Sequence, residues 1–330
     1  MTADPRRRRL VLAAAAAAAT GPFAGRFAYA QAWPSRQIRI VCPFPPGGLT
    51  DLYSRAIADH LQTSLGQNVI VENRPGAGGL IGNEAVAKAA PDGYTLLVTI
   101  QTTMVQAQVL YKKLPFNPEN DFTWISALGA GHLPFAVPAS LPVRNFREFV
   151  DYAKTNPTSM GTYAAGSFPH MVAGQLNKLY GTKIEAVHYR GEAPMWIDLA
   201  GGQIQGGIGS VAGLLPHIQK GSARAIAVPT SVRSPKLPDI PTFVEQGFNE
   251  PVFALRGWIG LFGPAKLPRE IAERLSRLVI EAGDSARLKQ VYDTFGIAER
   301  PTTPEEFLRL YRTEGQQWIA IARELGITLD

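Results

Sequence analysis

The sequence predicts an α/β protein in which helices pack on parallel sheets. Short apolar runs rich in β-branched residues alternate with amphipathic segments through the first 100 residues, and the alternation returns between about 135 and 228. Glycine-rich loops stand where several of these runs pass into helices. In such sheets ligands bind beyond the carboxyl ends of the strands, so these loops are the first candidates for a site.

An export signal is expected at the N-terminus. Four consecutive arginines precede an apolar run of eleven residues at 10–20, which is shorter than the ~18–20 residues of a bilayer span. Small-x-small patterns at 28–30 and 30–32 fit signal cleavage, and residues 7–11 also fit a twin-arginine pattern. We therefore expect 1–32 to be a signal peptide, by the Sec or the twin-arginine route, and a periplasmic mature protein.

The charge of the chain argues against nucleic acid as a partner. The formal net charge is +6, but the leader holds five arginines against Asp4, so the remainder carries only +2. Cys42 is the only cysteine, which excludes an internal disulfide. Because it ends an apolar run, we interpret Cys42 as a small core residue rather than a thiol nucleophile.

Strands and helices alternate along most of the chain. The expected strands are 37–41, 68–71, 94–99, 135–137, 160–163, 184–189, 223–228 and 258–262. The expected helices are 50–67, 83–90, 143–155, 167–180, 193–200 and 214–220. Thr50 or Asp51 is a suitable cap for the first helix, and Asn145 for the third. Residues 110–121 are predicted to form a polar excursion, and 229–251 a surface connection.

The C-terminal part is predicted to be helical, with helices at 269–282, 286–294 and 304–325. Helices without an intervening strand must pack on a sheet that already exists, and the first one is the simplest choice. We therefore predict a discontinuous first domain, 33–130 with 255–330, and a second domain, 131–254.

The stretch 41–51, VCPFPPGGLTD, has the composition of a loop that binds a ligand through main-chain groups. Gly47 and Gly48 are expected to expose N–H groups where the dipole of the next helix is positive, which suits a carboxylate. A second small-residue loop at 164–170 enters another helix. Two such loops from two domains would clamp a small dicarboxylate; the alternative is two ordinary strand-to-helix turns.

Residues with catalytic potential are few. The five histidines show no HExxH spacing, and there is no cysteine cluster, G-x-S-x-G elbow or Walker A lysine. Ser167 stands three residues before His170, but at a helix entrance it is expected to be a cap rather than a nucleophile. The glycines at 76–82 miss the dinucleotide fingerprint, because position 81 is Ile, and are expected to form a tight packing turn. We expect no catalytic residue, metal or cofactor.

Several motifs together give a specific resemblance. They are WPS at 33–35, PFPPGGLTD at 43–51, VENRPGAGG at 71–79, AKAAPDGYTLL at 87–97, YKKLP at 111–115 and PHI at 216–218. With these motifs, spread over nearly all of the mature chain, the sequence resembles the Bug-type extracytoplasmic solute receptors of tripartite tricarboxylate transporters.

The resemblance implies a two-domain periplasmic-binding-protein fold of type II, the Venus-flytrap arrangement, with the ligand cleft between the domains. It implies a receptor that captures a small carboxylate for membrane permease subunits, and we expect the receptor to be a monomer. Two walls of the site follow by similarity. The first is Phe44, Gly47, Gly48, Leu49, Thr50, Asp51, Thr102 and Thr103, and the second is Thr162, Tyr163, Gly166, Ser167, His170, Gly209 and Ser210. Asp51 is expected to shape its loop, because it would repel a carboxylate.

The chain departs from the family where ligand identity is set. Relatives often have small polar residues at 163–165, where this chain has Tyr163 and two alanines, and an acidic residue and an amide at Gly209 and Ser210. The missing acidic residue weighs against an amino acid as ligand. Tyr163 and Phe168 either stack on an aromatic or apolar body or merely fill the domain interface. The ligand is thus a di- or tricarboxylate, or an aromatic or apolar carboxylate.

Two other functional classes remain as alternatives. A sensor that presents its ligand to a signalling protein in the membrane would have the same sequence features, and neighbouring genes would separate it from a transport receptor. A hydrolase or dehydrogenase on the same scaffold would need a nucleophile or a cofactor motif, and the sequence offers neither.

Overall fold

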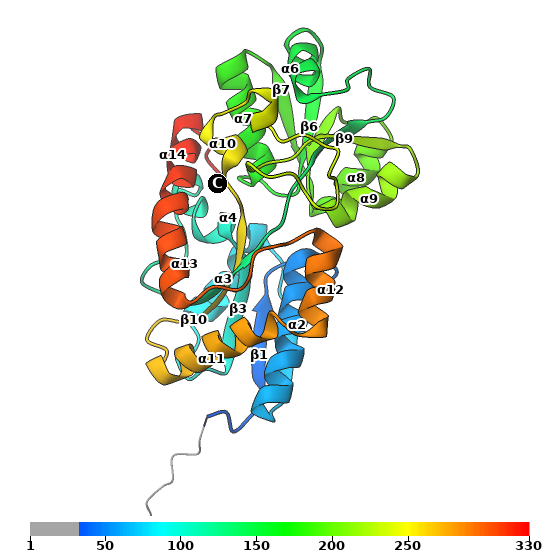
Figure 1. The fold of residues 1–330 in the computed structure, drawn as a ribbon. Coiled ribbons are helices and arrows are strands. Elements are labelled where there is room, and N and C mark those ends of the chain that lie inside the picture. Colours follow the sequence, from blue (N-terminus) through cyan, green and yellow to red (C-terminus); the bar gives the residue numbers. More distant parts are fainter. Residues whose placement is uncertain (1–32, 330) are drawn as a thin grey trace, which may run out of the picture. The chain divides into compact units, whose positions relative to one another are not determined.

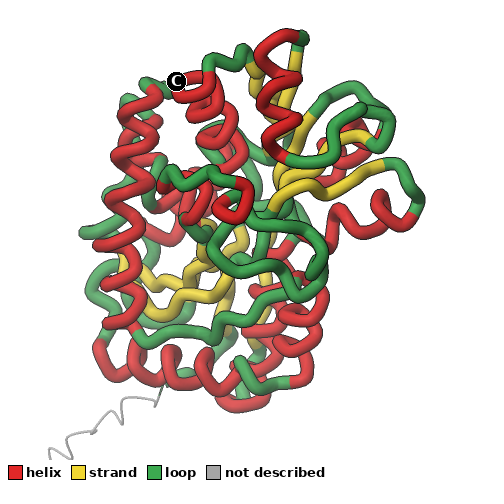
Figure 2. The backbone as a smooth tube through the Cα atoms, turned by 45° about the horizontal axis from the view of Figure 1, so that its top comes forward, coloured by secondary structure: helices red, strands yellow, loops and turns green. Residues whose placement is uncertain are grey.

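Two five-stranded sheets organise the chain from Arg36 onward (Figure 1). The computed structural model describes residues 33–329, so the expected signal peptide at 1–32 lies outside the described residues. Figure 2 shows the strands inside layers of helices, as the α/β prediction requires.

The first sheet has the strand order β2-β1-β3-β10-β4. Its strands are β1 (Ile38–Cys42), β2 (Val69–Asn73), β3 (Thr95–Ile100), β4 (Phe122–Gly129) and β10 (Trp258–Pro264). β1 pairs in parallel with β2 and β3, as expected, whereas β10 runs antiparallel between β3 and β4. The sheet is therefore mixed, and its last two strands come from distant parts of the sequence.

The strand β4 was missing from the sequence-based prediction. Nearly all of its residues are buried, and Trp124 packs edge-on against Phe262 and Phe307, with ring centroids 4.9 and 4.8 Å apart. Its only strand partner is β10, more than a hundred residues later in the chain. No local pattern reveals such a partner, because pairing and burial rather than propensity stabilise a strand of this kind.

Helices cover the first sheet. They are α2 (Leu49–Leu65), the 3₁₀ turn η1 (Ala77–Gly79), α3 (Leu80–Ala87), α4 (Gln101–Met104), α5 (Ala107–Leu110), α11 (Arg269–Ala282) and α12 (Ala286–Phe295). α11 and α12 pack against α2, and α11 also contacts β4. Two of the C-terminal helices, α11 and α12, thus contact elements of the first sheet.

The second sheet has the order β7-β6-β8-β5-β9. Its strands are β5 (Phe135–Pro138), β6 (Thr158–Thr162), β7 (Ile184–His188), β8 (Gly206–Ile208) and β9 (Ala223–Ala227). Its helices are α6 (Phe146–Thr155), α7 (Phe168–Tyr180), α8 (Glu192–Ala200) and α9 (Val211–Gln219). The predicted cap of α6 is confirmed, because Asn145 accepts a hydrogen bond from the amide of Glu148. β6 is parallel to both β7 and β8, so their carboxyl ends lie at one edge.

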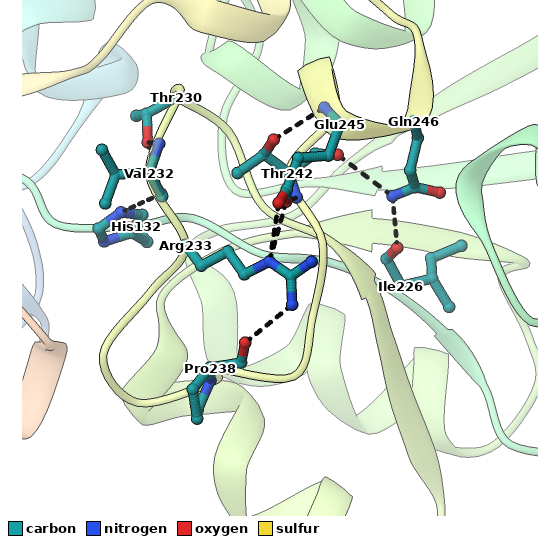
Figure 3. Close-up of polar contacts among 9 residues, drawn as sticks. All are labelled: His132, Ile226, Thr230, Val232, Arg233, Pro238, Thr242, Glu245 and Gln246. Carbon is teal, nitrogen blue, oxygen red and sulfur yellow. Dashed lines mark hydrogen bonds and ion pairs between the residues drawn. The ribbon is translucent and has the colours of Figure 1, made fainter.

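The segment between β9 and β10 is more than the expected surface connection. Its exposed side is held by Arg233, which contacts both carboxylate oxygens of Glu245 at 2.9 and 3.1 Å and the carbonyl of Pro238 at 3.1 Å (Figure 3). Its other side inserts Phe243, Phe248 and Phe253 into the core, each almost fully buried. The segment also includes the short helices η2 (Val244–Gln246) and α10 (Pro251–Ala254).

The predicted helix at 304–325 is interrupted. It consists of α13 (Pro304–Leu310), a π-helical turn η3 (Tyr311–Gly315) and α14 (Gln316–Leu325). Thr303 and Glu306 form a capping box at its start. α14 packs against α5 and α7, which brings the end of the chain to the helix that follows the second glycine loop.

Candidate functional site

The two glycine loops have the same local construction. In each, a glycine with positive φ precedes the N-cap residue, and the third residue of the helix accepts a hydrogen bond from that glycine's amide. The glycines are Gly47 (φ 94°) and Gly166 (φ 74°), in the left-handed region that favours glycine. Neither N-cap side chain bonds to the helix. The first N–H groups of α2 are thus left without a capping side chain. In α7 the second residue is Pro169, which has no N–H, and the amide of the first residue, Phe168, bonds to the Tyr163 hydroxyl.

In the first loop, the helix begins at Leu49, one residue earlier than expected. The N-cap is Gly48, so Thr50 and Asp51 lie in the first turn and neither is the cap. The amide of Gly47 donates to Asp51 Oδ2 at 3.0 Å, which corrects the expectation that this N–H is exposed to a ligand. The groups that remain for an anion are the N–H groups from Gly48 onward, and Pro45 to Gly48 are exposed.

Asp51 is 2% exposed and is the centre of a polar network. Arg55 Nε donates to its Oδ2 at 3.0 Å and Asn73 Nδ2 to its Oδ1 at 2.8 Å, while Asn73 also donates to the carbonyl of Phe44. Burial acts to raise the pKa of Asp51, but the hydrogen bonds from Arg55, Asn73 and the Gly47 amide together hold this pKa below its ordinary value. The carboxylate therefore shapes the loop from inside, and its oxygens accept hydrogen bonds from within the protein.

The base of the first loop rests on the following helix. A Cβ on Gly82 would lie 2.7 Å from Pro43 Cβ, and one on Gly79 would lie 3.1 Å from Phe44 Cζ. The glycines at 76–82 thus permit the close packing of α3 on the loop, in line with the predicted packing turn.

Cys42, at the end of β1, is fully buried, and burial raises the pKa of its thiol. Both observations fit the interpretation of Cys42 as a core residue.

Thr102 and Thr103, which follow β3, differ in exposure. Thr102 is partly exposed, whereas Thr103 is 2% exposed. The hydroxyl of Thr103 lies 3.0 Å from the carbonyl of Ile100 and 2.9 Å from both Asn83 Nδ2 and Thr99 Oγ1. Its hydrogen-bonding capacity is used within the fold, so Thr103 supports the wall rather than presenting its hydroxyl.

In the second loop, Ser167 occupies the N-cap position but does not cap α7 through its side chain. Its hydroxyl donates instead to the carbonyl of Ala164 at 2.6 Å, which corrects the expected capping bond. Thr162 is fully buried, and its hydroxyl donates to the same carbonyl at 3.2 Å. Phe168 is 6% exposed and packs edge-on against Trp318, with ring centroids 5.7 Å apart. Phe168 is thus a buried packing residue.

His170 holds the second loop as a neutral imidazole. The Gly166 amide donates to its Nδ1 at 2.9 Å, so Nδ1 is unprotonated and the ring proton resides on Nε2. Burial, and then the charge of the neighbouring His188, lowers the pKa of His170 to about 4. The His188 ring lies 4.5 Å away, centroid to centroid, and its Nδ1 is 2.7 Å from Thr162 Oγ1. The two glycine loops thus use different acceptors for the same bond.

At the end of β8, Gly209 and Ser210 have structural partners. A Cβ on Gly209 would lie 2.7 Å from Cζ2 of Trp196, a residue that is 1% exposed. Ser210 caps α9 by accepting from the Gly213 amide, and it donates to Glu192. Sequence reasoning missed Glu192. The available signal was its position directly after Gly191 at the end of a predicted strand.

Tyr163 lies between these elements and is partly exposed. Its carbonyl accepts from the Gly191 amide at 3.2 Å, which ties the second loop to the start of α8. Burial, and then the charge of Glu192, raises the pKa of the Tyr163 hydroxyl above its ordinary value. The predicted second-wall residues Thr162, Tyr163, Gly166, Ser167 and His170 are therefore brought together, with Ser210 linked to them through Glu192.

An open hollow of about 680 Å³ lies beside the second loop. It is lined by α7, β7 and the C-terminal segment, and it includes His170 and His188 but no residue of the first loop. Lys178 and Glu324 form an ion pair across it at 2.7 Å. Between residues 33 and 329, no group of three or more His, Cys, Asp or Glu side chains is arranged as a metal site, and no helix is long and apolar enough to cross a membrane.

Comparisons with known proteins give consistent results. A family model described as the tripartite tricarboxylate transporter family receptor matches residues 53–327. Protein BugT of Bordetella pertussis strain Tohama I is 32% identical over 303 residues, which cover 91% of this chain and 92% of BugT.

Two solved structures from Rhodopseudomonas palustris are similar over nearly their full length. Rpa4515, in a structure with adipate, is 30% identical with a TM-score of 0.82, and the match covers 90% of this chain and 99% of that one. MatC, with bound malate, is 28% identical with a TM-score of 0.78, and the match covers 88% and 100% of the two chains.

Proposed function

Because the chain belongs to the tripartite tricarboxylate transporter receptor family, we propose that it captures a small carboxylate in the periplasm and delivers it to membrane permease subunits. Its fold is the two-domain α/β fold of periplasmic binding proteins, as the sequence predicted. The observation that carries the ligand proposal is the first glycine loop, which leaves the first N–H groups of α2 without a side-chain cap. Such N–H groups favour an anion.

The proposed domains are 33–130 with 255–330, and 131–254, and the ligand is proposed to bind between them. The ends of strands in both sheets support this arrangement, since one glycine loop follows β1 and the other follows β6. A ligand that contacts both domains favours the closed state by its differential contacts, so binding and closure are linked. The solved relatives with adipate and with malate support a di-carboxylate over other anions.

The proposed walls are those predicted from the sequence, with roles revised by the geometry. In the first wall, the N–H groups from Gly48 to Thr50 bind the ligand, Thr102 contributes its side chain, and Asp51 with Thr103 supports the loop. In the second wall, the Tyr163 hydroxyl, which is bonded to the Phe168 amide at the start of α7, faces the ligand. Tyr163 leaves room for an apolar or aromatic carboxylate as well as a di- or tricarboxylate.

The remaining parts of the proposal follow from the family. The protein performs no chemistry on its ligand, acts as a monomer and needs no cofactor. It reaches the periplasm by means of a signal peptide at 1–32, through the Sec or the twin-arginine route. The arginines and the apolar run of the leader support export, and the receptor family supports the destination.

The test is a double variant, Gly47→Ala with Gly48→Ala. Both sites have open space around an added Cβ, so the fold should persist, while the change strains Gly47 at φ 94° and places methyl groups in front of the N–H groups. Titration calorimetry with adipate, malate and succinate should show loss of measurable binding. The matched control is Gly66→Ala, which ends the same helix at φ 65° with equal space and should bind normally. Unchanged affinity in the double variant would refute the loop assignment.

A thermal-shift screen tests the ligand class without assuming a particular compound. A specific ligand raises the melting temperature by mass action, so mono-, di- and aromatic carboxylates are compared at equal concentrations with nucleotides and sugars. The proposal requires that at least one carboxylate raises the midpoint. A set of carboxylates without effect, beside a nucleotide that stabilises the protein, would overturn it.

A further inference from the structure

Three loops meet at one edge of the second sheet. β7, β6 and β8 are parallel neighbours, so their carboxyl ends lie together, and Tyr163, Glu192 and Ser210 follow these ends within a few residues. Gly191 is tied to Tyr163 by the bond from its amide to the Tyr163 carbonyl. This edge is where open α/β sheets bind ligands, and it carries the second glycine loop.

The carboxylate of Glu192 is fixed at this edge by one of its oxygens. Ser210 donates to Oε2 from its amide at 2.9 Å and from its hydroxyl at 2.6 Å. The Trp196 indole N–H lies beside the same carboxylate and also favours its charged form. The other oxygen, Oε1, accepts neither bond from Ser210, and within the residues that the structure describes no ion pair joins Glu192 to a cation. Two directional bonds therefore orient a carboxylate whose second oxygen remains available.

Trp196 explains why this carboxylate comes from α8 rather than from the end of β8. Its indole fills the space that side chains would need at Gly209 and Gly213, where an added Cβ would in each case lie 2.7 Å from the ring. An acidic residue at position 209 is thus incompatible with Trp196. Glu192 instead reaches the neighbouring residue, Ser210, from the first turn of α8, so the edge keeps a carboxylate although position 209 has none.

Because Glu192 is buried, its carboxylate strongly affects which ligand groups can bind beside it. Burial raises the pKa of Glu192 in spite of the opposing hydrogen bonds from Ser210 and Trp196. A second carboxylate brought to this place would be repelled, because the local dielectric is low and no cation compensates. A hydroxyl or ammonium group would be attracted, because it can donate to Oε1.

We propose that Glu192 is a specificity-determining residue that selects carboxylates bearing a hydrogen-bond donor, a hydroxyl or an ammonium group, on the carbon chain. This inference rests on the proposed function, because it places the donor of the bound carboxylate against Glu192 while a carboxylate group occupies a helix N-terminus. It reverses the conclusion drawn from the missing acidic residue at 209. A site with a buried acceptor rejects a ligand without the matching donor more strongly than an apolar site does.

The experiment compares ligands that differ only in the donor. Titration calorimetry near neutral pH is performed with succinate, malate and aspartate, with adipate and 2-hydroxyadipate, and with benzoate and 4-hydroxybenzoate. In the set that the wild type binds, the donor-bearing member should bind about tenfold tighter or more than the plain member. In Glu192→Gln the ratio should fall to about threefold or less, because the donor loses its charged acceptor and the plain member no longer leaves a buried charge unpaired.

Two further variants separate a role in specificity from a role in folding. Glu185→Gln is the matched control, because Glu185 is an exposed glutamate on β7, and its ratio should equal that of the wild type. Ser210→Ala leaves the carboxylate in place but removes the hydroxyl that orients it, so the ratio should fall part of the way. Thermal melts of each variant check the fold, and Ser210→Ala supplies the test if Glu192→Gln does not fold.

The outcomes distinguish this inference from the proposed function. If no member of any set binds, the carboxylate proposal fails and the role of Glu192 fails with it. If carboxylates bind but the wild type shows no preference for the donor, or keeps the same preference in Glu192→Gln, the role of Glu192 is refuted while the receptor proposal stands.

Discussion

The loops before α2 and α7 use one backbone design with two different side chains. In both, a left-handed glycine donates its amide to the third helical residue, which is Asp51 in the first loop and His170 in the second. Asp51 is an ion that Arg55 and Asn73 stabilise, whereas His170 is neutral and has a pKa of about 4. The geometry of a ligand loop thus does not require a particular charge inside it; it requires an acceptor at the right place.

The loops differ also in what surrounds them. Nothing lies within 4 Å of an added Cβ at Gly47 or Gly48, whereas a Cβ on Gly166 would lie 2.2 Å from Leu110 Cδ1 and 3.7 Å from Leu329 Cδ1. The first loop is therefore stabilised by its internal polar network, and the second by packing against α5 and the C-terminal segment. Substitutions should therefore destabilise the first loop by removing polar contacts and the second by disturbing its packing.

The largest difference is expected between Gly166→Ala and Gly47→Ala. Both add the strain of a side chain at positive φ, roughly 1–2 kcal/mol, but only Gly166→Ala also forces Leu110 to move, at a further cost of about 1–3 kcal/mol. Urea unfolding should show Gly166→Ala to be less stable than Gly47→Ala by at least about 1 kcal/mol. Gly181→Ala, at φ 70° with open space at the end of α7, controls for strain alone.

An equal loss of stability in all three glycine variants would mean that backbone strain dominates and that the packing around Gly166 does not contribute to stability. A double variant, Gly166→Ala with Leu110→Ala, sharpens the comparison. The smaller side chain at 110 removes the atom that the new Cβ would meet. The two losses should therefore be less than additive, as expected for residues in direct contact.

A smaller effect is expected for Asp51→Asn. The amide oxygen can still accept from Gly47, but the charge that pairs with Arg55 is lost, and the new NH₂ group faces the Asn73 donor. We expect a loss of about 1–2 kcal/mol, the range for hydrogen bonds to charged groups. His170→Asn keeps an acceptor without losing a charge and should cost less. Urea unfolding of both variants at neutral pH measures the difference, and a larger loss for His170→Asn would contradict the account of the first loop.

Much of this site followed from sequence patterns, and what did not follow depended on contacts distant in the chain. The alternation of strands and helices predicted the fold class, and two glycine loops at helix starts were located correctly. Asp51 was expected to shape its loop, but neither Asp51 nor His170 was assigned as the acceptor of the glycine amide, although the shared spacing Gly47-x-x-x-Asp51 and Gly166-x-x-x-His170 was visible. A side chain bonds four residues back only once the glycine adopts positive φ, which a sequence does not display.

The role of Glu192 and the strand β4 eluded sequence reasoning for a related reason. Ser210 and Trp196 determine what Glu192 does, and neither is adjacent to it in the chain. β4 likewise depends on β10. Residues of this kind are defined by partners that only the folded chain brings together, so propensity and periodicity carry no signal for them.

The smallest predicted effect separates the two loops by pH. The pKa of His170 is lowered by burial and by His188. As the pH falls below 6.5, the ordinary pKa of histidine, His170 takes up a proton in the unfolded chain but stays neutral in the folded protein. Stability is therefore present above about 6.5 and is lost as the pH falls toward 4. Asp51, whose pKa lies below 3.8, is ionised in both states throughout this window and contributes no change until the pH is lower still.

Urea unfolding at about pH 7 and about pH 5 tests this separation. After an allowance for solvent at the partly exposed ring, the wild type should lose about 1 kcal/mol more than His170→Asn between the two values. His188, whose pKa burial also lowers, is present in both proteins and cancels to a first approximation. Asp51→Asn should follow the wild type over the same range. If His170→Asn and the wild type lose stability equally, His170 is not held neutral in the folded protein, and the contrast between a charged first loop and a neutral second loop is wrong.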